Sequence, residues 1–208
     1  MNKQLGAMAL LFVTCCLLGC HQSINNLKEY YQYLNTPSNG LIKLKSIGSM
    51  AFSMKYLPSD LYVYKTMMDS PNLSIDSLKK EYDSSLNFIL KIAPSEESDA
   101  QFDVMTETVS SLAEFQEQTL TVNFGLQKFI YLKLGDQKIK PVLVEAENVY
   151  GLTKHRLINI VFAKDEFEEL WNREDKIDLV FNDEIYNTGK HHFLFDKSDF
   201  LSIPQLEY

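Results

Sequence analysis

Three cysteines stand within six positions near the start of the chain, and thiols at such close spacing can bind a metal or form a disulfide. They are Cys15, Cys16 and Cys20. Adjacent cysteines such as the first two seldom form a zinc site, whose ligand pairs are usually two to four residues apart. Three is also an odd number for a disulfide framework. We therefore expect neither a metal nor any other cofactor at these thiols.

The residues before Cys20 have the form of a secretory signal peptide. The single charge of Lys3 is followed by an apolar run of 14 residues from Leu5 to Leu18, interrupted only by a glycine and a threonine. A membrane-spanning helix needs roughly 20 apolar residues, so this run favours a signal peptide over an anchor helix. The run ends in the tetrapeptide LLGC at positions 17–20, which resembles the lipobox of bacterial lipoproteins.

The lipobox predicts how the start of the chain is processed. We expect residues 1–19 to be removed by cleavage between Gly19 and Cys20, and the thiol of Cys20 to carry lipid. Cys15 and Cys16 leave with the signal peptide, so that residues 20–24 form a lipidated tether ahead of one domain at 25–208. Two or more acyl chains anchor a protein stably. The predicted first partner is therefore a membrane, held through acyl chains on Cys20.

The residues after Cys20 favour one membrane. An aspartate directly after the lipidated cysteine favours retention in the inner membrane of many diderm bacteria, and here the residue is His21. The following HQSINN also lacks the acidic cluster that resembles a surface-export signal. These features favour the outer membrane with the domain facing the periplasm, and exposure on the cell surface is the alternative.

The composition predicts an acidic, folded domain. Removal of residues 1–19 deletes one lysine and no acid, which moves the formal net charge from −8 to −9. Nucleic-acid binding relies on clustered Lys and Arg, so this charge excludes nucleic acid as an expected partner. With 45% hydrophobic and 12% aromatic residues, the chain can build a core without a disulfide.

The hydrophobic pattern predicts an α+β fold in which an N-terminal helix and strand section packs on a C-terminal antiparallel section resembling a β-sandwich. The mixed section covers residues 25–118 and the mainly β section covers 119–208. Within the first, residues 102–118 predict a helix whose apolar face includes Val104 or Met105, Val109, Leu112 and Phe115. The lone Trp171 has helical spacing with neighbouring apolar residues, which favours a place in the core.

Several short motifs are similar to those of an uncharacterised lipoprotein family from Bacteroidota-type bacteria. They are the NGL turn at 39–41, the YLP step at 56–58, YGLT at 150–153 and NTG at 187–189, with their flanking segments. The resemblance spans most of the chain after the signal peptide. The resemblance implies the membrane location of a lipoprotein and the fold, and it implies no catalytic residues.

The histidines do not have the pattern of a metal site. His21 lies in the predicted tether and His155 follows a turn, while His191 and His192 are adjacent and would face opposite sides of a strand. Zinc usually needs three or four convergent ligands. The chain also lacks the G-x-S-x-G, P-loop, dinucleotide and HExxH motifs.

Two acidic segments contain the best candidates for hydrolytic chemistry. Two carboxylates about 5–10 Å apart across a cleft can hydrolyse a glycoside, and oxygen-rich loops can bind calcium. The segments lack the glycine and spacing of an EF-hand loop, and charged loops are usually solvated. The acids concerned are Asp165, Glu166, Glu168, Glu169, Asp183 and Glu184.

The sequence therefore predicts a membrane-anchored lipoprotein without a catalytic site. Its expected role is that of a binding or structural module of the cell envelope, which uses sheet edges or loops to hold a protein or glycan partner. A carboxylate-dependent envelope hydrolase is one alternative. A protective role, in which the tethered domain blocks an incoming toxin, is another.

Overall fold

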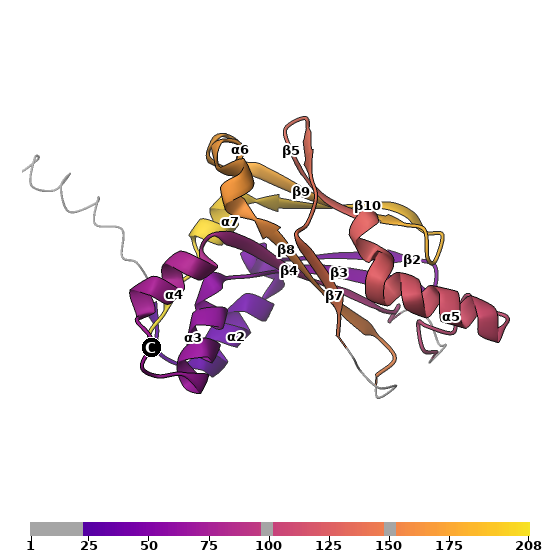
Figure 1. The fold of residues 1–208 in the computed structure, drawn as a ribbon, viewed down its shortest axis with the longest axis horizontal. Coiled ribbons are helices and arrows are strands. Elements are labelled where there is room, and N and C mark those ends of the chain that lie inside the picture. The colour runs from indigo at the N-terminus through magenta and orange to yellow at the C-terminus, as the bar shows by residue number, and fades with distance from the viewer. Residues whose placement is uncertain (1–22, 97–101, 148–152) are drawn as a thin grey trace, which may run out of the picture.

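The computed structural model describes residues 23–96, 102–147 and 153–208, so Cys15, Cys16, Gly19, Cys20 and His21 lie outside the described part. Two antiparallel sheets stack face to face (Figure 1). The larger sheet has five strands in the order β2-β3-β4-β8-β7. Their bounds are Ile42–Ile47, Met50–Leu57, Ser85–Pro94, Arg156–Ala163 and Leu143–Ala146.

The smaller sheet has four strands in the order β10-β9-β5-β6. Strand β10 at one edge of this sheet alternates between the core and solvent, as a sheet with one solvated face should. In β10 the inward positions are His191, Phe193 and Phe195, and the residues between them are exposed. The bounds of the four strands are Gly189–Asp196, Lys176–Asp183, Ile130–Leu134 and Gln137–Ile139.

Aromatic side chains fill the space between the two sheets. Phe52 of β3 lies 6.0 Å from Phe181 of β9, measured between ring centroids. Phe88 of β4 lies 5.6 Å from Phe195 of β10. All four rings are buried, and each buries a large apolar area. These contacts join the two sheets into one hydrophobic core.

Helices cover the two ends of the sandwich. Helices α2, α3 and α4 gather at one end, α5 lies at the other, and α6 and α7 lie near the ends of β9 and β10 (Figure 1). The bounds of α2 to α7 are Leu27–Asn35, Ser59–Asp69, Ile75–Tyr82, Leu112–Leu120, Glu168–Arg173 and Lys197–Leu201. Shorter helical turns are η1 to η4, at Pro37–Asn39, Thr121–Gly125, Leu126–Lys128 and Lys164–Phe167. No helix in the described residues is long and apolar enough to cross a bilayer.

The turn in the NGL motif requires glycine. Gly40 has a φ of +74°, in the left-handed region that residues with a side chain rarely adopt. A Cβ at this position would also meet the Asp199 carboxylate, since the nearest oxygen would be 1.9 Å away. The motif therefore brings the turn after α2 against α7, which is about 160 residues later in the chain.

Two of the residues predicted as a tether, Ser23 and Ile24, are part of the folded domain. Ser23 and Ile24 form β1, which pairs in parallel with β11 at Gln205–Leu206. The amide of Glu207 also donates to the carbonyl of Ile24. Backbone pairing with the C-terminal strand therefore brings these two residues into the fold.

The predicted helix over residues 102–118 is wrong in its first half. The carboxylate of Asp103 accepts from the amide of Met105 at 2.9 Å and turns the chain, while Val104 and Met105 enter the core. The helix begins only at Leu112, where the Ser111 hydroxyl caps it by accepting from the amide of Glu114. Leu112 is therefore exposed rather than on an apolar face.

The α+β class with antiparallel sheets is confirmed. The division of the strands differs from the expected one, because the five-stranded sheet combines β2, β3 and β4 from the first section with β7 and β8 from the second. A helical stretch, α5 followed by η2 and η3, runs to Lys128 and precedes the β-rich remainder. The two sections are thus interleaved.

Candidate functional site

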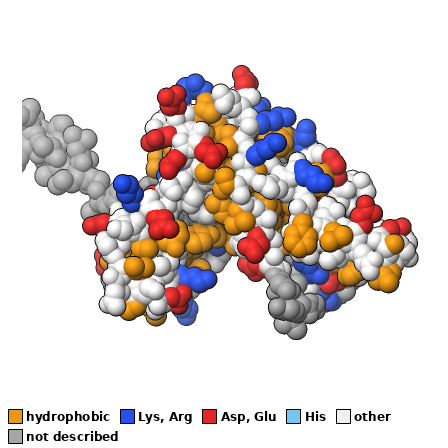
Figure 2. Space-filling model, in the orientation of Figure 1, with side chains coloured by type: hydrophobic (Ala, Val, Ile, Leu, Met, Phe, Trp, Pro, Cys, Tyr) orange, Lys and Arg blue, Asp and Glu red, His pale blue; other side chains and the backbone are white. Residues whose placement is uncertain are grey.

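A cavity of about 360 Å³ opens between α3 and α4 on one side and α6 and α7 on the other. In Figure 1 this region lies at the end of the sandwich where the chain terminus also lies, and Figure 2 shows hydrophobic side chains between the lobes of the surface. Its volume is in the range of small-ligand sites, about 300–1,000 Å³. Its lining residues are Tyr30, Tyr56, Pro58, Ser59, Asp60, Lys79, Asp83, Ser85, Leu86, Lys164, Trp171, Phe200, Leu201, Ile203 and Gln205.

Stacked aromatic rings form the wall of this cavity. Tyr56, at the end of β3, lies parallel to Phe200 of α7 with ring centroids 3.9 Å apart. Trp171 of α6 continues the stack, 6.5 Å from Phe200. Trp171 is half-buried and packs against the core, as its spacing predicted. The ring of Phe88 packs against both Tyr56 and Phe200, with ring centroids 5.5 and 6.2 Å apart.

The hydroxyl of Tyr30 is an unusual feature of the cavity. Tyr30 lies on α2 and is 0% exposed, and its hydroxyl has no hydrogen-bond partner among the described residues. Burial raises the pKa of Tyr30, with a smaller contribution from the Asp60 carboxylate, so the phenol stays protonated. A buried polar group without a partner costs free energy. A polar ligand atom in the cavity would supply the missing partner.

Charges of both signs line the cavity. Asp60 accepts from the amide of Leu206 and from the Tyr208 hydroxyl, and Asp83 accepts from the Ser59 hydroxyl. Of the two lysines, Lys79 lies 5.3 Å from the Tyr208 ring centroid. The ammonium of Lys164 has no hydrogen bond or ion pair with any described residue. Two acids and two lysines make the lining neutral in an otherwise acidic protein.

The six acids proposed for hydrolysis or calcium binding do not come together. Four of them are exposed on η4 and α6, before β9, whereas Asp183 ends that strand and Glu184 follows it. A strand rises about 3.3 Å per residue, so the length of β9 alone separates the two groups by about 23 Å. Nowhere in residues 23–96, 102–147 and 153–208 do three metal-ligating side chains cluster.

Asp183 is buried and organises the loop between β9 and β10. One carboxylate oxygen accepts from the amides of Ile185 and Tyr186, both at 3.0 Å. The other accepts from the amide and the hydroxyl of Thr188. With four hydrogen bonds donated to it, this carboxylate is occupied by the loop. Its role in the fold is therefore that of a loop anchor.

His191 is the buried end of the same chain of hydrogen bonds. The Thr188 hydroxyl gives its proton to Asp183, so its oxygen accepts from Nε2–H of His191 at 2.7 Å. This assigns the proton to Nε2 and leaves Nδ1 without a partner among the described residues. His191 and His192 lie on opposite faces of β10, as predicted, and the structure shows that His191 is the buried one.

We expect the protein to lose stability as the pH falls below about 6.5, the usual pKa of histidine. Burial lowers the pKa of His191, and the Asp183 carboxylate offsets that shift only in part. At this residue the unfolded chain therefore takes up a proton that the folded protein does not, so His191 alone contributes a slope of at most about 1.4 kcal/mol per pH unit. Urea midpoints at pH 7.5 and 5.5 measure this.

A matched pair of variants assigns this pH effect. In His191→Phe the ring remains among aromatic neighbours but cannot titrate, so its midpoint should depend less on pH. His155, whose pKa burial also lowers, retains its share of the slope. Leu194→Gln, at an exposed position of the same strand that does not titrate, should keep the wild-type slope. An unchanged slope in His191→Phe would contradict the assignment.

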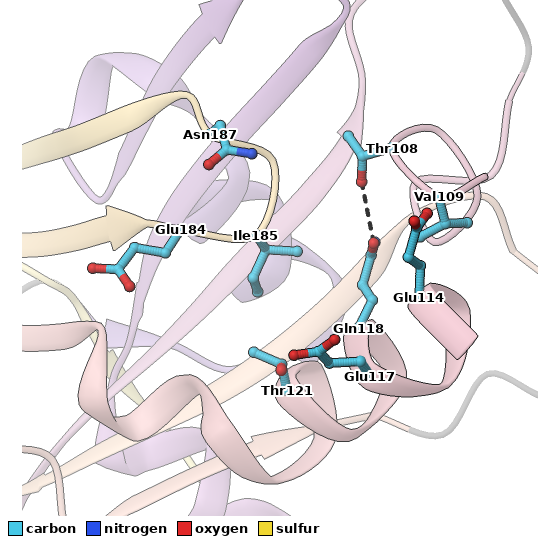
Figure 3. Close-up of a pocket in the computed structure, with 9 residues that line it drawn as sticks. All are labelled: Thr108, Val109, Glu114, Glu117, Gln118, Thr121, Glu184, Ile185 and Asn187. Carbon is cyan, nitrogen blue, oxygen red and sulfur yellow. Dashed lines mark hydrogen bonds between the residues drawn. The ribbon is translucent and has the colours of Figure 1, made fainter. Parts of the chain in front are cut away.

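A second, open cleft of about 230 Å³ separates α5 from the loop after β9. Figure 3 shows the carboxylate of Glu184 pointing away from those of Glu114 and Glu117. Glu114 accepts from the amide of Ser110, and Glu184 from the Asn182 side chain. Glu114 and Glu184 therefore make local contacts, and the carboxylate of Glu184 does not converge with the other two.

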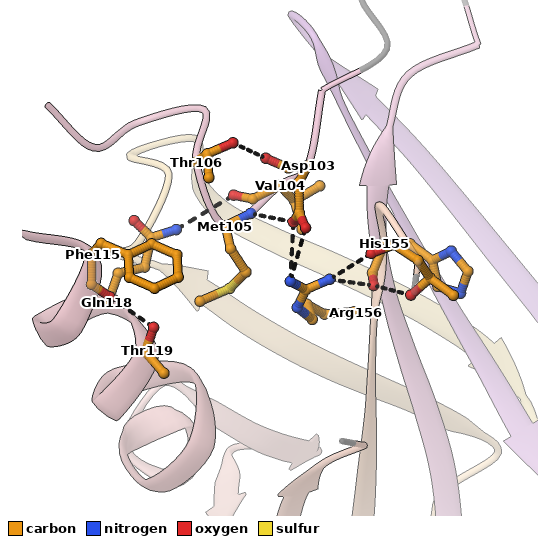
Figure 4. A network of polar contacts seen from close by, with 10 residues as sticks. Asp103, Val104, Met105, Thr106, Phe115, Gln118, Thr119, His155 and Arg156 are labelled. Carbon is orange, nitrogen blue, oxygen red and sulfur yellow. Dashed lines mark hydrogen bonds and ion pairs between the residues drawn. The ribbon is translucent and has the colours of Figure 1, made fainter. Parts of the chain in front are cut away.

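A polar network attaches the segment before α5 to β8 (Figure 4). Arg156 forms an ion pair with Asp103 at 3.0 Å, and its other nitrogen donates to the carbonyls of Thr153 and His155. Gln118 of α5 donates to the carbonyl of Val104. Every donor and acceptor named here is used within the fold, so the network is structural.

The cavity residues had no signal in the sequence that marked them as a site. They come from six separate segments. The one available hint was the mixture of tyrosines with an acid in KEYYQYL and YLPSDLYVY, which is also typical of a surface helix. A single sequence does not show which of these side chains meet.

Comparisons with known proteins assign no function to the chain. No protein-family model matches it, and no curated protein matches it. A matching solved structure is a novel protein of unknown function from Burkholderia pseudomallei, with 10% sequence identity and a TM-score of 0.40. The match covers 86% of this chain and 91% of that one.

Proposed function

We propose that this chain is a membrane-anchored lipoprotein that acts as a non-catalytic binding module of the cell envelope. The observation that carries the proposal is the cavity between α3–α4 and α6–α7, which is lined by Tyr30, a residue whose buried hydroxyl has no hydrogen-bond partner among the described residues. Such a group favours a polar ligand over an empty pocket, because a ligand atom would restore the missing hydrogen bond.

The position of the cavity supports the link with an anchor. Gln205 of β11 lines the cavity and pairs with Ser23 of β1. Ser23 is three residues after Cys20, and three extended residues reach at most about 11 Å. If Cys20 carries lipid, the cavity lies close to the bilayer. The proposed location is the outer membrane, with the domain on the periplasmic side.

The scattered acids give no support to the hydrolase alternative. A carboxylate pair would have to face one another across one cleft, whereas Asp183 is occupied by its loop and the acids of α6 lie at the other end of β9. No contact or surface in the described residues favours the protective alternative specifically. The binding module is therefore the proposal we retain.

Metabolic labelling with palmitate tests the anchor. We expect label on the wild-type protein and complete loss of it in Cys20→Ala, because the thioether needs this thiol. The Cys15→Ala and Cys16→Ala variants are matched controls and should keep the label, since both positions leave with the signal peptide. Label that persists in Cys20→Ala would refute the anchor.

Co-purification tests the binding role separately. After crosslinking in intact cells, the wild-type protein should retain a reproducible ligand or partner, and a variant with a filled cavity, Ser85→Trp, should lose it. Ser85 lines the cavity. The exposed position Ser110 offers the control Ser110→Trp. Equal recovery from both variants would count against the cavity as the binding site.

A further inference from the structure

We infer that the cavity between α3–α4 and α6–α7 binds a small zwitterion that carries both a phosphate and an ammonium group, of the kind found in phospholipid headgroups. The inference rests on the proposed function, because it names the ligand class of that binding module. It is argued from the charges, the free donors and the aromatic wall of the cavity.

Several donors along the cavity are suited to the phosphate, although the Ser59 hydroxyl among them already donates to Asp83. Helix α3 begins there without a side-chain cap, since Pro58 occupies the N-cap position and Ser59 and Asp60 of the first turn line the cavity. The start of a helix presents free amide groups and a partial positive charge, which favour anions. The ammonium of Lys164 and the protonated hydroxyl of Tyr30 are further donors without partners among the described residues.

The other features of the lining are suited to the ammonium. Asp83 uses one carboxylate oxygen for the Ser59 hydroxyl, and no described residue donates to the other. Tyr56 lines the same space, with one face of its ring covered by Phe200. Trp171 lines it too, but the ammonium of Lys197 already lies 5.1 Å from its ring centroid. Carboxylates and aromatic faces are the groups that attract organic cations, including the ammonium groups of lipid headgroups.

The charge balance distinguishes a zwitterion from a simple anion. Lys79 and Lys164 would favour an anion, but Asp60 and Asp83 lie in the same wall and would repel it. A ligand with one charge of each sign satisfies both sets of groups without leaving either unpaired. The exposed Leu201 at the rim and the partly buried Ile203 add apolar surface on which the hydrocarbon next to a headgroup could lie.

The fluorescence of Trp171 tests this inference directly, because it is the single tryptophan of the chain and lines the cavity. The full chain, purified in a maltoside detergent, is titrated with glycerophosphoethanolamine, inorganic phosphate or ethanolamine. We expect a saturable change with the zwitterion and at least tenfold weaker binding of either part alone. No saturable change with the zwitterion, or equal binding of phosphate alone, would overturn the inference.

Removal of one oxygen tests the role of Tyr30. The Tyr30→Phe variant should fold with unchanged or higher stability, because its hydroxyl has no partner without ligand. It should bind the zwitterion about tenfold more weakly, the usual effect of losing one hydrogen bond to a charged group. Tyr31→Phe, exposed on the same helix, should bind as the wild type does. Equal binding by Tyr30→Phe would refute the assignment.

Two further titrations distinguish a membrane lipid from a soluble molecule as the source of the headgroup. Nanodiscs of phosphatidylethanolamine should change the Trp171 fluorescence and nanodiscs of phosphatidylglycerol should not, if the ligand is a lipid. A response to soluble glycerophosphoethanolamine alone would support the same chemistry and assign a soluble phosphoamine as the source. Because the titration does not depend on the acyl chains, its failure is distinguishable from a failure of palmitate labelling.

Discussion

The Phe88→Ala variant should lose about 3–5 kcal/mol of unfolding free energy, the usual cost of removing a buried aromatic ring. Phe88 is 1% exposed and contacts rings from both sheets and from α7: Tyr56, Phe162, Phe195 and Phe200. Its neighbours belong to separate elements, which cannot all move inward to fill the space. In a domain of this size the melting temperature should fall by roughly 6–20 °C.

Two matched variants make this prediction specific. Phe88→Leu keeps an apolar side chain in the space and should cost much less than Phe88→Ala. Phe124→Ala removes the same group from a site that is 82% exposed and should change stability by less than about 0.5 kcal/mol. Thermal and urea unfolding measure all three. A Phe88→Ala protein as stable as Phe124→Ala would show that the sheets do not pack through this ring.

The Asp183→Asn variant should lose about 2–4 kcal/mol, because hydrogen bonds to a charged group contribute about 1.5–3 kcal/mol each and an unsatisfied buried group has a further cost. Asp183 is 2% exposed and accepts four hydrogen bonds from its own loop. An amide NH2 in place of one oxygen would face the N–H and O–H of Thr188. The loop between β9 and β10 should then open.

An acidic neighbour supplies the control for Asp183. Glu184→Gln changes the charge by the same amount at an exposed position and should alter stability by less than about 0.5 kcal/mol. Amide hydrogen exchange at Ile185, Tyr186 and Thr188 should accelerate in Asp183→Asn and not in Glu184→Gln. Equal stability of the two variants would be incompatible with Asp183 as the anchor of the loop.

The sequence predicted the elements whose pattern is local. Strands β3, β8 and β10 alternate between buried and partly or fully exposed residues, and this period of two is visible in MAFSMKYL, RLINIVFA and GKHHFLFD. Helix α2 also has a local pattern, the helical spacing of three and four residues between Leu27, Tyr30 and Leu34. The α+β class follows from such local patterns.

The pairing of distant segments was not predictable from the sequence. Nothing near Ser23 shows that it pairs with Gln205, and nothing near Asp103 shows that its side chain stops a helix by turning the chain and binding Arg156. The cavity depends on such long-range contacts between six segments. The acids proposed for hydrolysis lie far apart in the fold, and this too depends on long-range contacts that the sequence does not show.

The pairing of β1 with β11 connects the two parts of the account. The lipobox at residues 17–20 predicts a lipid anchor at Cys20. Ser23, three residues later, pairs with Gln205, which lines the cavity. The central claim is therefore that the cavity beside the N-terminal strand is the binding surface of an anchored protein.

Photo-crosslinking in living cells tests this claim most directly. A photoreactive side chain is placed at Leu201, which lines the cavity and is 69% exposed, and in a separate protein at Leu112 of α5, which is 72% exposed and does not line it. The account predicts an adduct from position 201 and none from position 112, with the adduct reduced in Tyr30→Phe. Adducts from position 112 alone, or equal adducts from both positions, would contradict it.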